Sequence, residues 1–417
     1  MLHDCFLWNS VYRYIASILK KCRDCDVEYC DDTVPFKDII AQVGTEEDIK
    51  IASILQFTRY KNFLLIRYGS YADIYSGESE VTPDEIWDMY DGFYRECRSL
   101  VVDLCREEIV LSPFRKFRNL NEGEENSLKN IKQRIANCKS LEVSNKLDGS
   151  MQSATWYHGE LVMSGSRALD PNESWRLQDG MSMLKSNPGY IKMLKEWPEY
   201  TFIFEYISLK DAHVVKYTKE QEGLYLIGIR DKRNGNQLSY KEVLDYSDRY
   251  NVKTTRVFNK TLDDILQDIK VGKADEMEGY VLNIDGYMVK IKCDDYVCIH
   301  KAISGLCSPN SVIKAIADDT FDDFISKVPQ AYKEKIMEIA EKVVTYVATT
   351  GVDVKLYCEL GRTLTGDNKK DFMIWVDKCV PEKLKGYVRN SYLGIPVNYL
   401  KSGNKECPHY KKISELQ

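Results

Sequence analysis

A single lysine constrains this chain more than any other residue. Within the stretch Ser144-Asn145-Lys146-Leu147-Asp148-Gly149-Ser150, Lys146 ends a strand-type segment and runs directly into Asp-Gly, which is a turn sequence. Burying an ammonium group is costly, so an amine in this position needs a reason to be there. One reason is covalent catalysis, because desolvation or a neighbouring cation lowers the pKa of a lysine and frees its amine to attack phosphorus. The alternative is a surface lysine beside an ordinary hairpin turn.

Length and composition limit the classes of protein that fit. The 417 residues are enough for two domains, each with its own core, and 44% hydrophobic with 29% charged residues is typical of a soluble globular protein. The net charge of -6 does not exclude a basic groove, so only local charge can indicate a polyanionic partner. The sequence has neither an apolar run of about 18 residues nor the features of a signal peptide. We therefore expect no membrane partner and a cytoplasmic location.

The 13 cysteines are scattered and odd in number, which favours reduced thiols over a disulfide framework. One cluster contains Cys22, Cys25 and Cys30, with Cys5 upstream. A zinc site needs a fourth ligand at a sensible spacing, but no second Cys-x-x-Cys and no pair of histidines follows. The sequence therefore disfavours a metal site at this cluster.

Strand-type runs dominate the middle of the chain. Segments rich in Val, Ile, Leu and Tyr are separated by charged residues, Ser-Pro, or tight His-Gly and Asp-Gly turns, which is typical of antiparallel strands. Helical patterns interrupt them without the regular alternation of a doubly wound sheet. We expect a strand pair within residues 57–75, strands near residues 96–103, 109–114, 116–122, 152–157, 160–164, 202–207, 224–230, 279–284 and 287–292, and helices at 8–22, 124–139, 175–197 and 240–250, with another starting at Thr82-Pro83-Asp84-Glu85.

The pattern changes past about His300. Apolar residues there recur at spacings of three and four, which predicts helices at residues 311–317, 331–349, 369–379 and 382–393. The expected fold class is therefore α+β, with an antiparallel-sheet domain at residues 1–300 followed by a mainly α-helical domain at residues 301–417.

Four more charged residues gain meaning beside Lys146. Glu205 stands in the middle of an apolar strand, and Glu278 stands at the entry of another. Lys290 and Lys292 share one face of a strand, because side chains alternate with period two. If the substrate is a nucleoside triphosphate, the lysines can neutralise its α-phosphate, and the glutamates can hold hydrated magnesium. Each alone has an ordinary alternative, such as a solvated strand face, a paired acid or a turn.

Read in order, these stretches resemble the covalent nucleotidyltransferases and, within them, the phage RNA ligase 1 type of ATP-dependent RNA ligase. The resemblance covers about residues 66 to 300. Its general motifs are Lys146-Leu147-Asp148-Gly149-Ser150, Phe204-Glu205-Tyr206, Leu224 to Asp231, Glu278-Gly279-Tyr280-Val281 and Lys290-Ile291-Lys292. The signals more specific to this family are Glu96-Cys97-Arg98, Lys116-Phe117-Arg118-Asn119-Leu120-Asn121-Glu122 and Asp295-Tyr296-Val297-Cys298-Ile299-His300.

The resemblance implies a reaction in three steps. Lys146 attacks the α-phosphate of ATP to give a lysyl adenylate and pyrophosphate, AMP passes to the 5′-phosphate of an RNA end, and a 3′-hydroxyl then displaces AMP and seals the strand. It implies Mg²⁺, with Mn²⁺ as a substitute, and single-stranded or loop RNA as the partner. It also implies a role in RNA repair and, if the protein is viral like most of the family, a location in the host cytoplasm.

Carried over by position, the family's roles fall on particular residues. The catalytic residues are Lys146, Asp148, Lys290 and Lys292, with Asp148 orienting the lysine. The ATP-binding residues are Arg98, Lys116, Glu205, Ile227, Val281, Lys290 and Lys292, where Ile227 and Val281 sandwich the adenine and Arg98 and Lys116 contact the ribose and phosphates. Glu278 and Glu205 are the metal ligands.

Two parts of the chain depart from the family pattern. A basic residue is expected near the end of the strand that follows Lys146, whereas Ser164-Gly165-Ser166-Arg167 offers only Arg167 in this role. The first 60 or so residues are expected to be an N-terminal extension without a counterpart in the family.

The C-terminal part independently favours a polyanionic partner. From residue 383 to 412, basic residues outnumber acids, and tyrosines are interleaved, which suits phosphates and unpaired bases. The basic residues are Lys383, Lys385, Arg389, Lys401, Lys405, Lys411 and Lys412. An ordinary basic helical surface is the alternative. We expect this domain to recognise the RNA end.

Two other functions remain open at this point. DNA ligases and mRNA-capping guanylyltransferases share the nucleotidyl motifs, but they normally continue into a small β-barrel, and helices are expected here after His300. A relative that binds RNA without catalysis is the other alternative. The complete set of charged motif residues argues against it.

Overall fold

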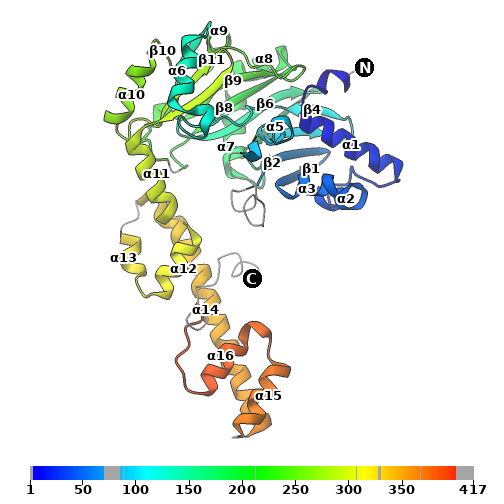
Figure 1. The fold of residues 1–417 in the computed structure, drawn as a ribbon, viewed down its shortest axis with the longest axis vertical. Helices are drawn as coiled ribbons and strands as arrows, with labels where there is room; N and C mark the ends of the chain where they lie inside the picture. Colours follow the sequence, from blue (N-terminus) through cyan, green and yellow to red (C-terminus); the bar gives the residue numbers. More distant parts are fainter. Residues whose placement is uncertain are drawn as a thin grey trace. The chain divides into compact units, whose positions relative to one another are not determined.

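The computed structural model describes residues 3–69, 85–87, 89–211, 213–306, 308–326, 330–366 and 368–400. The chain divides into two compact units, Met1–Val297 and Cys298–Gln417 (Figure 1). Most of the expected helix start at Thr82-Pro83-Asp84-Glu85 lies outside the described residues, as do the C-terminal lysines from Lys401 onward.

The first sheet of the larger unit is antiparallel and follows chain order. Its strands are β1 (Leu55–Tyr60), β2 (Phe63–Tyr68), β3 (Arg98–Asp103) and β4 (Glu108–Leu111). The helical elements that accompany it are η1 (His3–Phe6), α1 (Ser10–Asp24), α2 (Phe36–Val43), α3 (Glu46–Ser53), η2 (Glu85–Trp87) and α5 (Met89–Glu96). Asn9 caps α1 by accepting hydrogen bonds from the backbone of Val11 and Tyr12, which satisfies N–H groups that a helix start leaves unpaired.

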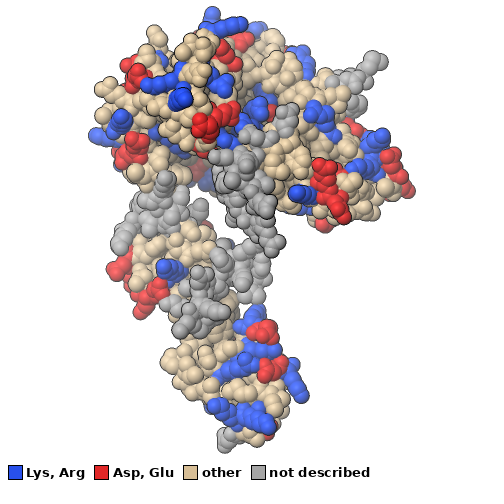
Figure 2. Space-filling model, in the orientation of Figure 1, with Lys and Arg blue, Asp and Glu red and all other residues tan. Residues whose placement is uncertain are grey.

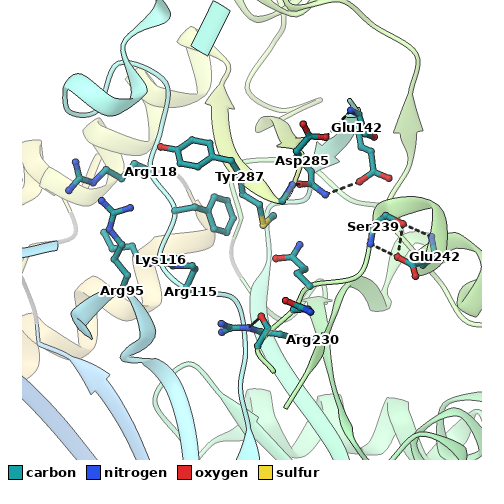
Figure 3. A pocket seen from close by; sticks show the side chains of 18 of the residues that line it. Arg95, Arg115, Lys116, Arg118, Glu142, Arg230, Ser239, Glu242, Asp285 and Tyr287 are labelled. Atoms are coloured by element: carbon teal, nitrogen blue, oxygen red, sulfur yellow. Dashed lines mark hydrogen bonds between the residues drawn. The ribbon is translucent and has the colours of Figure 1, made fainter. Parts of the chain in front are cut away.

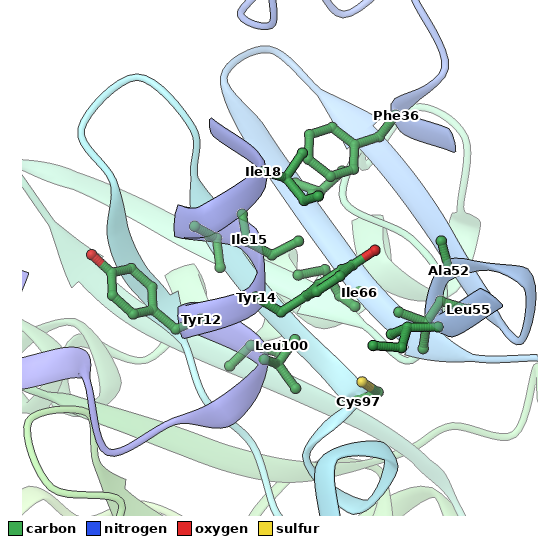
Figure 4. Close-up of a cluster of buried hydrophobic side chains, with 14 of the residues drawn as sticks. Tyr12, Tyr14, Ile15, Ile18, Phe36, Ala52, Leu55, Ile66, Cys97 and Leu100 are labelled. Carbon is green, nitrogen blue, oxygen red and sulfur yellow. The ribbon is translucent and has the colours of Figure 1, made fainter. Parts of the chain in front are cut away.

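The first 60 residues are built into this sheet. Ile15 and Ile18 of α1 are fully buried and belong to the same hydrophobic core as Ile66 of β2 and Leu100 of β3 (Figure 4). Phe36 of α2 completes this layer. The N-terminal helices therefore stabilise the sheet whose strand β3 begins at Arg98, and burial of one face explains why their apolar residues recur at helical spacing.

Two further four-stranded sheets make up the rest of the unit. One has the order β10 (Val257–Phe258), β5 (Leu141–Lys146), β11 (Gly279–Ile284) and β12 (Tyr287–Lys292). The other has the order β7 (Glu160–Gly165), β6 (Ser150–Tyr157), β8 (Tyr200–Ile207) and β9 (Gly223–Asp231). All strand pairs in these sheets are antiparallel.

Helices cover one face of each of these sheets and leave the other face to the site. The elements are η3 (Glu124–Asn126), α6 (Leu128–Ala136), α7 (Trp175–Ser186), α8 (Pro188–Glu196), η4 (Lys219–Gln221), α9 (Tyr240–Tyr250) and α10 (Leu262–Val271). α6 and α10 share a core with β5, β11 and β12, and α7, α8 and α9 share one with β6, β8 and β9. The expected helix at 175–197 is two helices, because Asn187 caps a new start with Pro188 in its first turn.

The smaller unit is helical. It contains α12 (Pro309–Ala317), α13 (Phe321–Ser326), α14 (Gln330–Thr365), α15 (Lys369–Cys379) and α16 (Glu382–Tyr392), and α11 (Asp294–Leu306) spans the division between the units. α14 runs well past the expected end at residue 349. One internal glycine, Gly351, costs a helix only about 1 kcal/mol, which burial of Val354 and Cys358 beyond it outweighs. No helix among the described residues has the length and apolarity needed to cross a bilayer.

The α+β class expected from the sequence is confirmed: antiparallel sheets fill the larger unit, and helices form the C-terminal part.

Candidate active site

Strand register brings Lys146 and Lys292 to the same end of one sheet. Gly279 of β11 pairs with Lys146 of β5 on one side and with Lys292 of β12 on the other. Glu278 lies one residue before that strand. Its Oε2 accepts a hydrogen bond from Lys146 Nζ at 2.7 Å, and its Oε1 forms an ion pair with Lys292 Nζ at 2.9 Å. The Glu278 side chain is only 4% exposed, so one buried carboxylate holds both lysines.

This arrangement reverses the expected state of the Lys146 amine. Burial lowers the pKa of Lys146, but the carboxylates of Glu278 and Glu205 outweigh it, so the pKa is raised. The expectation of a lowered pKa is therefore wrong for the protein without substrate. Lys146 is an ammonium ion here, and it can attack phosphorus only after Glu278 is drawn to another cation and the proton is lost.

Glu205 faces Lys146 from the opposite sheet. Along β8, Phe202, Phe204 and Tyr206 point into the helix-covered core, so the alternation of side chains turns Glu205 the other way. Burial and the neighbouring Glu278 raise the pKa of Glu205 to about 7, although Lys146 opposes this shift. The positive charge near Glu205 is thus too small to stabilise its ionised form. A bound cation would supply that charge.

Gly149 explains why the turn after Lys146 needs glycine. A Cβ atom at this position would lie 2.5 Å from the carbonyl oxygen of Tyr206 and 2.8 Å from Cγ of Glu205. Because such contacts are far inside van der Waals distance, only glycine lets the lysine-bearing turn approach the strand that carries Glu205.

Arg98 and Lys290 flank the ring of Phe117. The Arg98 guanidinium carbon lies 5.2 Å and Lys290 Nζ 5.1 Å from the ring centroid. Neither forms an ion pair with any described residue, and Nη1 of Arg98 is buried without a hydrogen-bond partner. Burial together with the charges of Arg98, Lys146 and Lys116 lowers the pKa of Lys290 to about 7. These two cations are short of negative charge, which a phosphate would supply.

Lys116 lies apart from this pair. Its ammonium group sits 4.3 Å from the ring centroid of Trp87 and 5.3 Å from that of Tyr68. Its chain segment runs beside β12, where the backbone N–H of Leu120 donates to the carbonyl of Lys290 at 2.7 Å. Lys116 is therefore held beside β12 but outside the cavity that contains Lys146.

That cavity lies between the two sheets and has a volume of about 180 Å³. Ile227 of β9 and Val281 of β11 both line it, as expected for residues that enclose a flat base. Sequence reasoning missed Phe114 and Met288, which belong to the same apolar cluster. In the sequence, each of these two residues is only an apolar residue beside charged ones. That pattern is common in strands and does not mark a binding site. The remaining charged lining residues include Arg98, Lys146, Glu205, Lys290 and Lys292.

Asp148 does not orient Lys146 by a direct hydrogen bond in this structure. Its Oδ2 accepts from the backbone N–H groups of Val214 and Val215 at 2.9 and 3.0 Å, and its Oδ1 accepts from the hydroxyl of Tyr296 at 2.9 Å. Its own N–H donates to the Tyr217 hydroxyl at 2.8 Å. Asp148 thus fastens the turn after Lys146 to the loop that follows β8 and to α11, and any influence on the lysine is indirect.

Arg167, like Lys116, is an expected ATP ligand that the structure does not bring into the cavity. Its side chain is exposed, and it is not among the residues that line the cavity. The backbone nearby is anchored, because Ser99 donates a hydrogen bond to the carbonyl of Ser166 at 2.9 Å. Arg167 therefore lies just past a fixed contact with the strand of Arg98, with its side chain directed to solvent.

Glu205 and Glu278 fit the metal that the family implies. Clusters of three or more His, Cys, Asp or Glu suited to a metal ion are absent from the described residues. Magnesium, however, commonly uses one or two carboxylates together with water and substrate phosphates. A carboxylate with a raised pKa beside one that already binds two cations meets that requirement.

A larger cavity of about 680 Å³ adjoins the first and shares Phe117 and Met288 with it. Arg95, Lys116 and Arg118 lie on one side of it, and Glu142 and Asp285 lie on the other (Figure 3). Both acids accept hydrogen bonds from backbone N–H groups, from residues 240 and 241 for Glu142 and from residues 139 and 140 for Asp285. We place the chemistry in the smaller cavity, because Lys146, Glu205, Arg98 and Lys290 all line it, and Glu278 binds Lys146 from beside it.

The fold and site define an α+β protein whose cavity between two antiparallel sheets holds a buried lysine among other charged residues. Residues 96–296 match the model of a family described as RNA ligase, the T4 RNA ligase 1 type, so this part of the chain is similar to that family. The match contains Arg98, Lys146, Glu205, Glu278, Lys290 and Lys292.

Solved structures of RNA ligases are also similar. An RNA ligase of Naegleria gruberi with pyrophosphate has 21% sequence identity and a TM-score of 0.35, covering 41% of this chain and 55% of that chain. A mutant of the same ligase with ATP and manganese has 20% identity and a TM-score of 0.36, covering 45% and 58%. An archaeal ATP-dependent RNA ligase has 14% identity and a TM-score of 0.45, covering 76% and 83%. The chain thus spans little more than half of the Naegleria protein.

Proposed function

We propose that this protein is an ATP-dependent RNA ligase that joins a 5′-phosphate to a 3′-hydroxyl through lysyl-AMP and AMP-capped RNA. The observation that carries the proposal is that Lys146, Glu205 and two cations without an acidic partner among the described residues line one cavity, while Glu278 binds Lys146 beside it. These groups come from strands far apart in the chain. The family match and the ligand chemistry reported for the Naegleria ligase, ATP with manganese, support the same reading.

In the first step, the adenine enters between Ile227 and Val281, and the triphosphate extends toward Arg98 and Lys290. Phosphate oxygens give these two cations the negative charge they lack, and at pH values above about 7, where Lys290 is neutral in the free protein, ATP binding draws a proton onto it. Lys292 then stabilises the charge that develops on the α-phosphate as Lys146 attacks.

Lys146 must lose its proton before it attacks. Glu278 and Glu205 would hold Mg²⁺, or Mn²⁺ in its place, and a bound divalent ion supplies positive charge beside the phosphates. When the cation binds Glu278, the carboxylate no longer raises the pKa of Lys146 as strongly. Burial then lowers that pKa and favours the neutral amine. Nζ then bonds to the α-phosphorus, and pyrophosphate leaves.

The later steps need RNA ends. We propose that AMP moves from Lys146 to an RNA 5′-phosphate and that a 3′-hydroxyl displaces it, in single strands or loops and in the context of RNA repair. The helical unit carries Lys and Arg side chains over α15 and α16, interspersed with acids (Figure 2). Lys383 and Lys385 belong to this surface. We propose that it contacts the RNA phosphates, which predicts that affinity falls as salt rises.

The test is a covalent-adduct assay. Protein is mixed with magnesium and ATP labelled at the α-phosphate, and label that survives denaturation is measured. We expect an adduct with ATP that is lost in Lys146→Ala and retained in Lys192→Ala, whose side chain is 69% exposed on α8. Absence of any adduct in the wild-type protein would contradict the proposal.

The same assay separates the alternatives. A preference for GTP would point to a capping guanylyltransferase. Addition of single-stranded RNA or DNA with a 5′-phosphate shows which polymer is sealed, and sealing of DNA alone would point to a DNA ligase. An adduct that forms but never passes to either polymer would leave the nucleotide chemistry intact and refute the RNA assignment.

A further inference from the structure

The cysteine cluster noticed in the sequence separates in the folded protein. Cys22 is buried in the N-terminal core, and Cys25 is exposed. Cys30 instead meets Cys105, which lies 75 residues further along the chain, with its Sγ atom 2.7 Å from that of Cys30. The pair joins the loop between α1 and α2 to the turn between β3 and β4.

Both sides of this contact are held in place by other interactions. On the loop side, Arg59 of β1 donates hydrogen bonds to the carbonyl of Tyr29 at 2.7 Å and to that of Val34 at 2.9 Å. On the turn side, the backbone N–H of Cys105 donates to Oδ1 of Asp103 at 2.9 Å. The two thiols are therefore brought together by the framework and do not depend on a chance meeting of mobile side chains.

We propose that Cys30 and Cys105 form a site of reversible oxidation, closing a disulfide that fastens the N-terminal helical layer to the first sheet. The oxidant is hydrogen peroxide. A disulfide requires sulfur atoms about 2.05 Å apart, so the two atoms need to approach only slightly.

The chemistry assigns a role to each thiol. Cys105 is exposed and meets the oxidant first, forming a sulfenic acid as the peroxide O–O bond breaks and water leaves. Burial and the hydrogen bond with Cys105 raise the pKa of Cys30 to about 12, so Cys30 remains a thiol until its neighbour is oxidised. Cys30 sulfur then attacks the Cys105 sulfur, its proton joins the departing hydroxide, and a second water is released. Two thiols and one peroxide thus give one disulfide and two waters.

The closed bond would constrain the chain between residues 30 and 105, which includes β1, β2 and all of β3. Cross-linking a long loop stabilises the folded state chiefly by restricting the unfolded one. We therefore expect the oxidised protein to melt at a higher temperature than the reduced protein, by a few degrees, and the difference to vanish after treatment with dithiothreitol.

Peptide mapping tests the proposal directly. The 417-residue protein is exposed to hydrogen peroxide, blocked with N-ethylmaleimide, digested without reductant and analysed by mass spectrometry. We expect one dominant cross-linked peptide pair that contains Cys30 and Cys105. Oxidation confined to other exposed thiols, Cys25, Cys298 or Cys379, would overturn the proposal, as would a disulfide between two copies of the chain.

A variant separates the roles of the two sulfurs. In Cys30→Ser, the sulfenic acid on Cys105 has no partner, so dimedone should label Cys105 strongly in this variant and weakly in the wild-type protein. Cys25→Ser, five residues away, is the matched control and should keep both the cross-link and the weak labelling. Equal labelling of Cys105 in all three proteins would rule out the disulfide, and because the readout is chemical, it does not depend on ligase activity.

Discussion

The cations of the nucleotide cavity fall into two pairs that differ in one respect. Lys146 and Lys292 share a carboxylate of Glu278, whereas Arg98 and Lys290 flank Phe117 without an acidic partner among the described residues. The paired group is stable in the free protein and must be released for chemistry. The unpaired group is costly in the free protein and becomes favourable when phosphate arrives. We therefore expect Arg98 and Lys290 to contribute most to phosphate binding, and the pair that contains Lys146 to supply the nucleophile.

After Lys146 itself, the largest effect on adduct formation should come from replacing Lys290 or Lys292. Lys290→Met and Lys292→Met should each slow formation of the lysyl adduct by about 10²- to 10³-fold, because each removes a cation that faces the developing charge. The two variants should differ in stability. Lys290→Met should stabilise the protein, because it removes a buried cation without a partner. Lys292→Met should destabilise it, because Glu278 keeps only one of its two lysines.

The stability difference has a definite sign with pH. The pKa of Lys290 is lowered to about 7 in the folded protein from an ordinary value near 10.5, so its burial costs stability below about pH 7, and the cost disappears as pH rises toward 10.5. Lys290→Met should therefore unfold at higher denaturant concentration than the wild type at pH 7, by about 1–3 kcal/mol, and show no gain at pH 10.5. Equal destabilisation by both variants at pH 7 would erase the distinction between the pairs.

Arg98→Ala should weaken ATP binding by about 100-fold, since a charge-assisted contact to phosphate is lost and no other group takes the position of the buried Nη1. Equilibrium binding of ATP without metal measures this. Arg115→Ala, a change at a 54% exposed arginine, is the matched control and should bind ATP as the wild type does. If Arg98→Ala binds ATP with wild-type affinity, Arg98 does not bind a phosphate of ATP.

Glu205→Gln tests the acid opposite Lys146. Because the pKa of Glu205 is raised to about 7, the ionised carboxylate costs stability above about pH 7, and the cost falls away as pH decreases toward 4.5. The amide should stabilise the metal-free protein by about 1–2 kcal/mol at pH 8 and leave it unchanged at pH 4.5. It should also weaken manganese binding, measured by calorimetry at pH 8 in the presence of ATP. Weaker manganese binding without the gain in stability would mean that Lys146 already neutralises Glu205.

The smallest effect is expected in the apolar slot. Val281→Ala removes two methyl groups that face the cavity and should raise KM for ATP by about 10-fold or less, with kcat nearly unchanged. Steady-state adenylylation at varied ATP gives both constants. A large fall in kcat with unchanged KM would place Val281 in the reaction itself and contradict the assignment of this wall to base binding.

Motif residues on strands were the easiest to predict. Glu205 and the lysine pair were found because period two fixes which face of a strand a residue occupies, and that rule needs only local sequence. Gly149 was recognisable as part of a turn, yet its actual reason, a carbonyl 2.5 Å from where a Cβ would stand, belongs to another strand. Phe117 was noticed only as part of a motif, and its contact with both Arg98 and Lys290 could not be inferred from neighbours in the chain.

One interpretation changed for a physical reason, and another stays a prediction. Asp148 is expected to orient the lysine indirectly, and its carboxylate accepts hydrogen bonds from the backbone of Val214 and Val215. Lys146 was expected to have a lowered pKa, but Glu278, 132 residues away in sequence, lies 2.7 Å from its Nζ. Electrostatic interactions depend on distance in space, and pairing of β5 with β11 sets that distance.

By itself, the sequence determined the α+β class, and the spacing of apolar residues predicted where many strands and helices lie. It also supplied the charged residues that are available for nucleotide chemistry. Only the tertiary structure decided which of those charges are paired and which are not, that the N-terminal helices share a core with the strand of Arg98, and that Cys30 meets Cys105. Periodicity is a property of neighbours along the chain, whereas pairing of charges and thiols requires segments distant in sequence to be placed side by side.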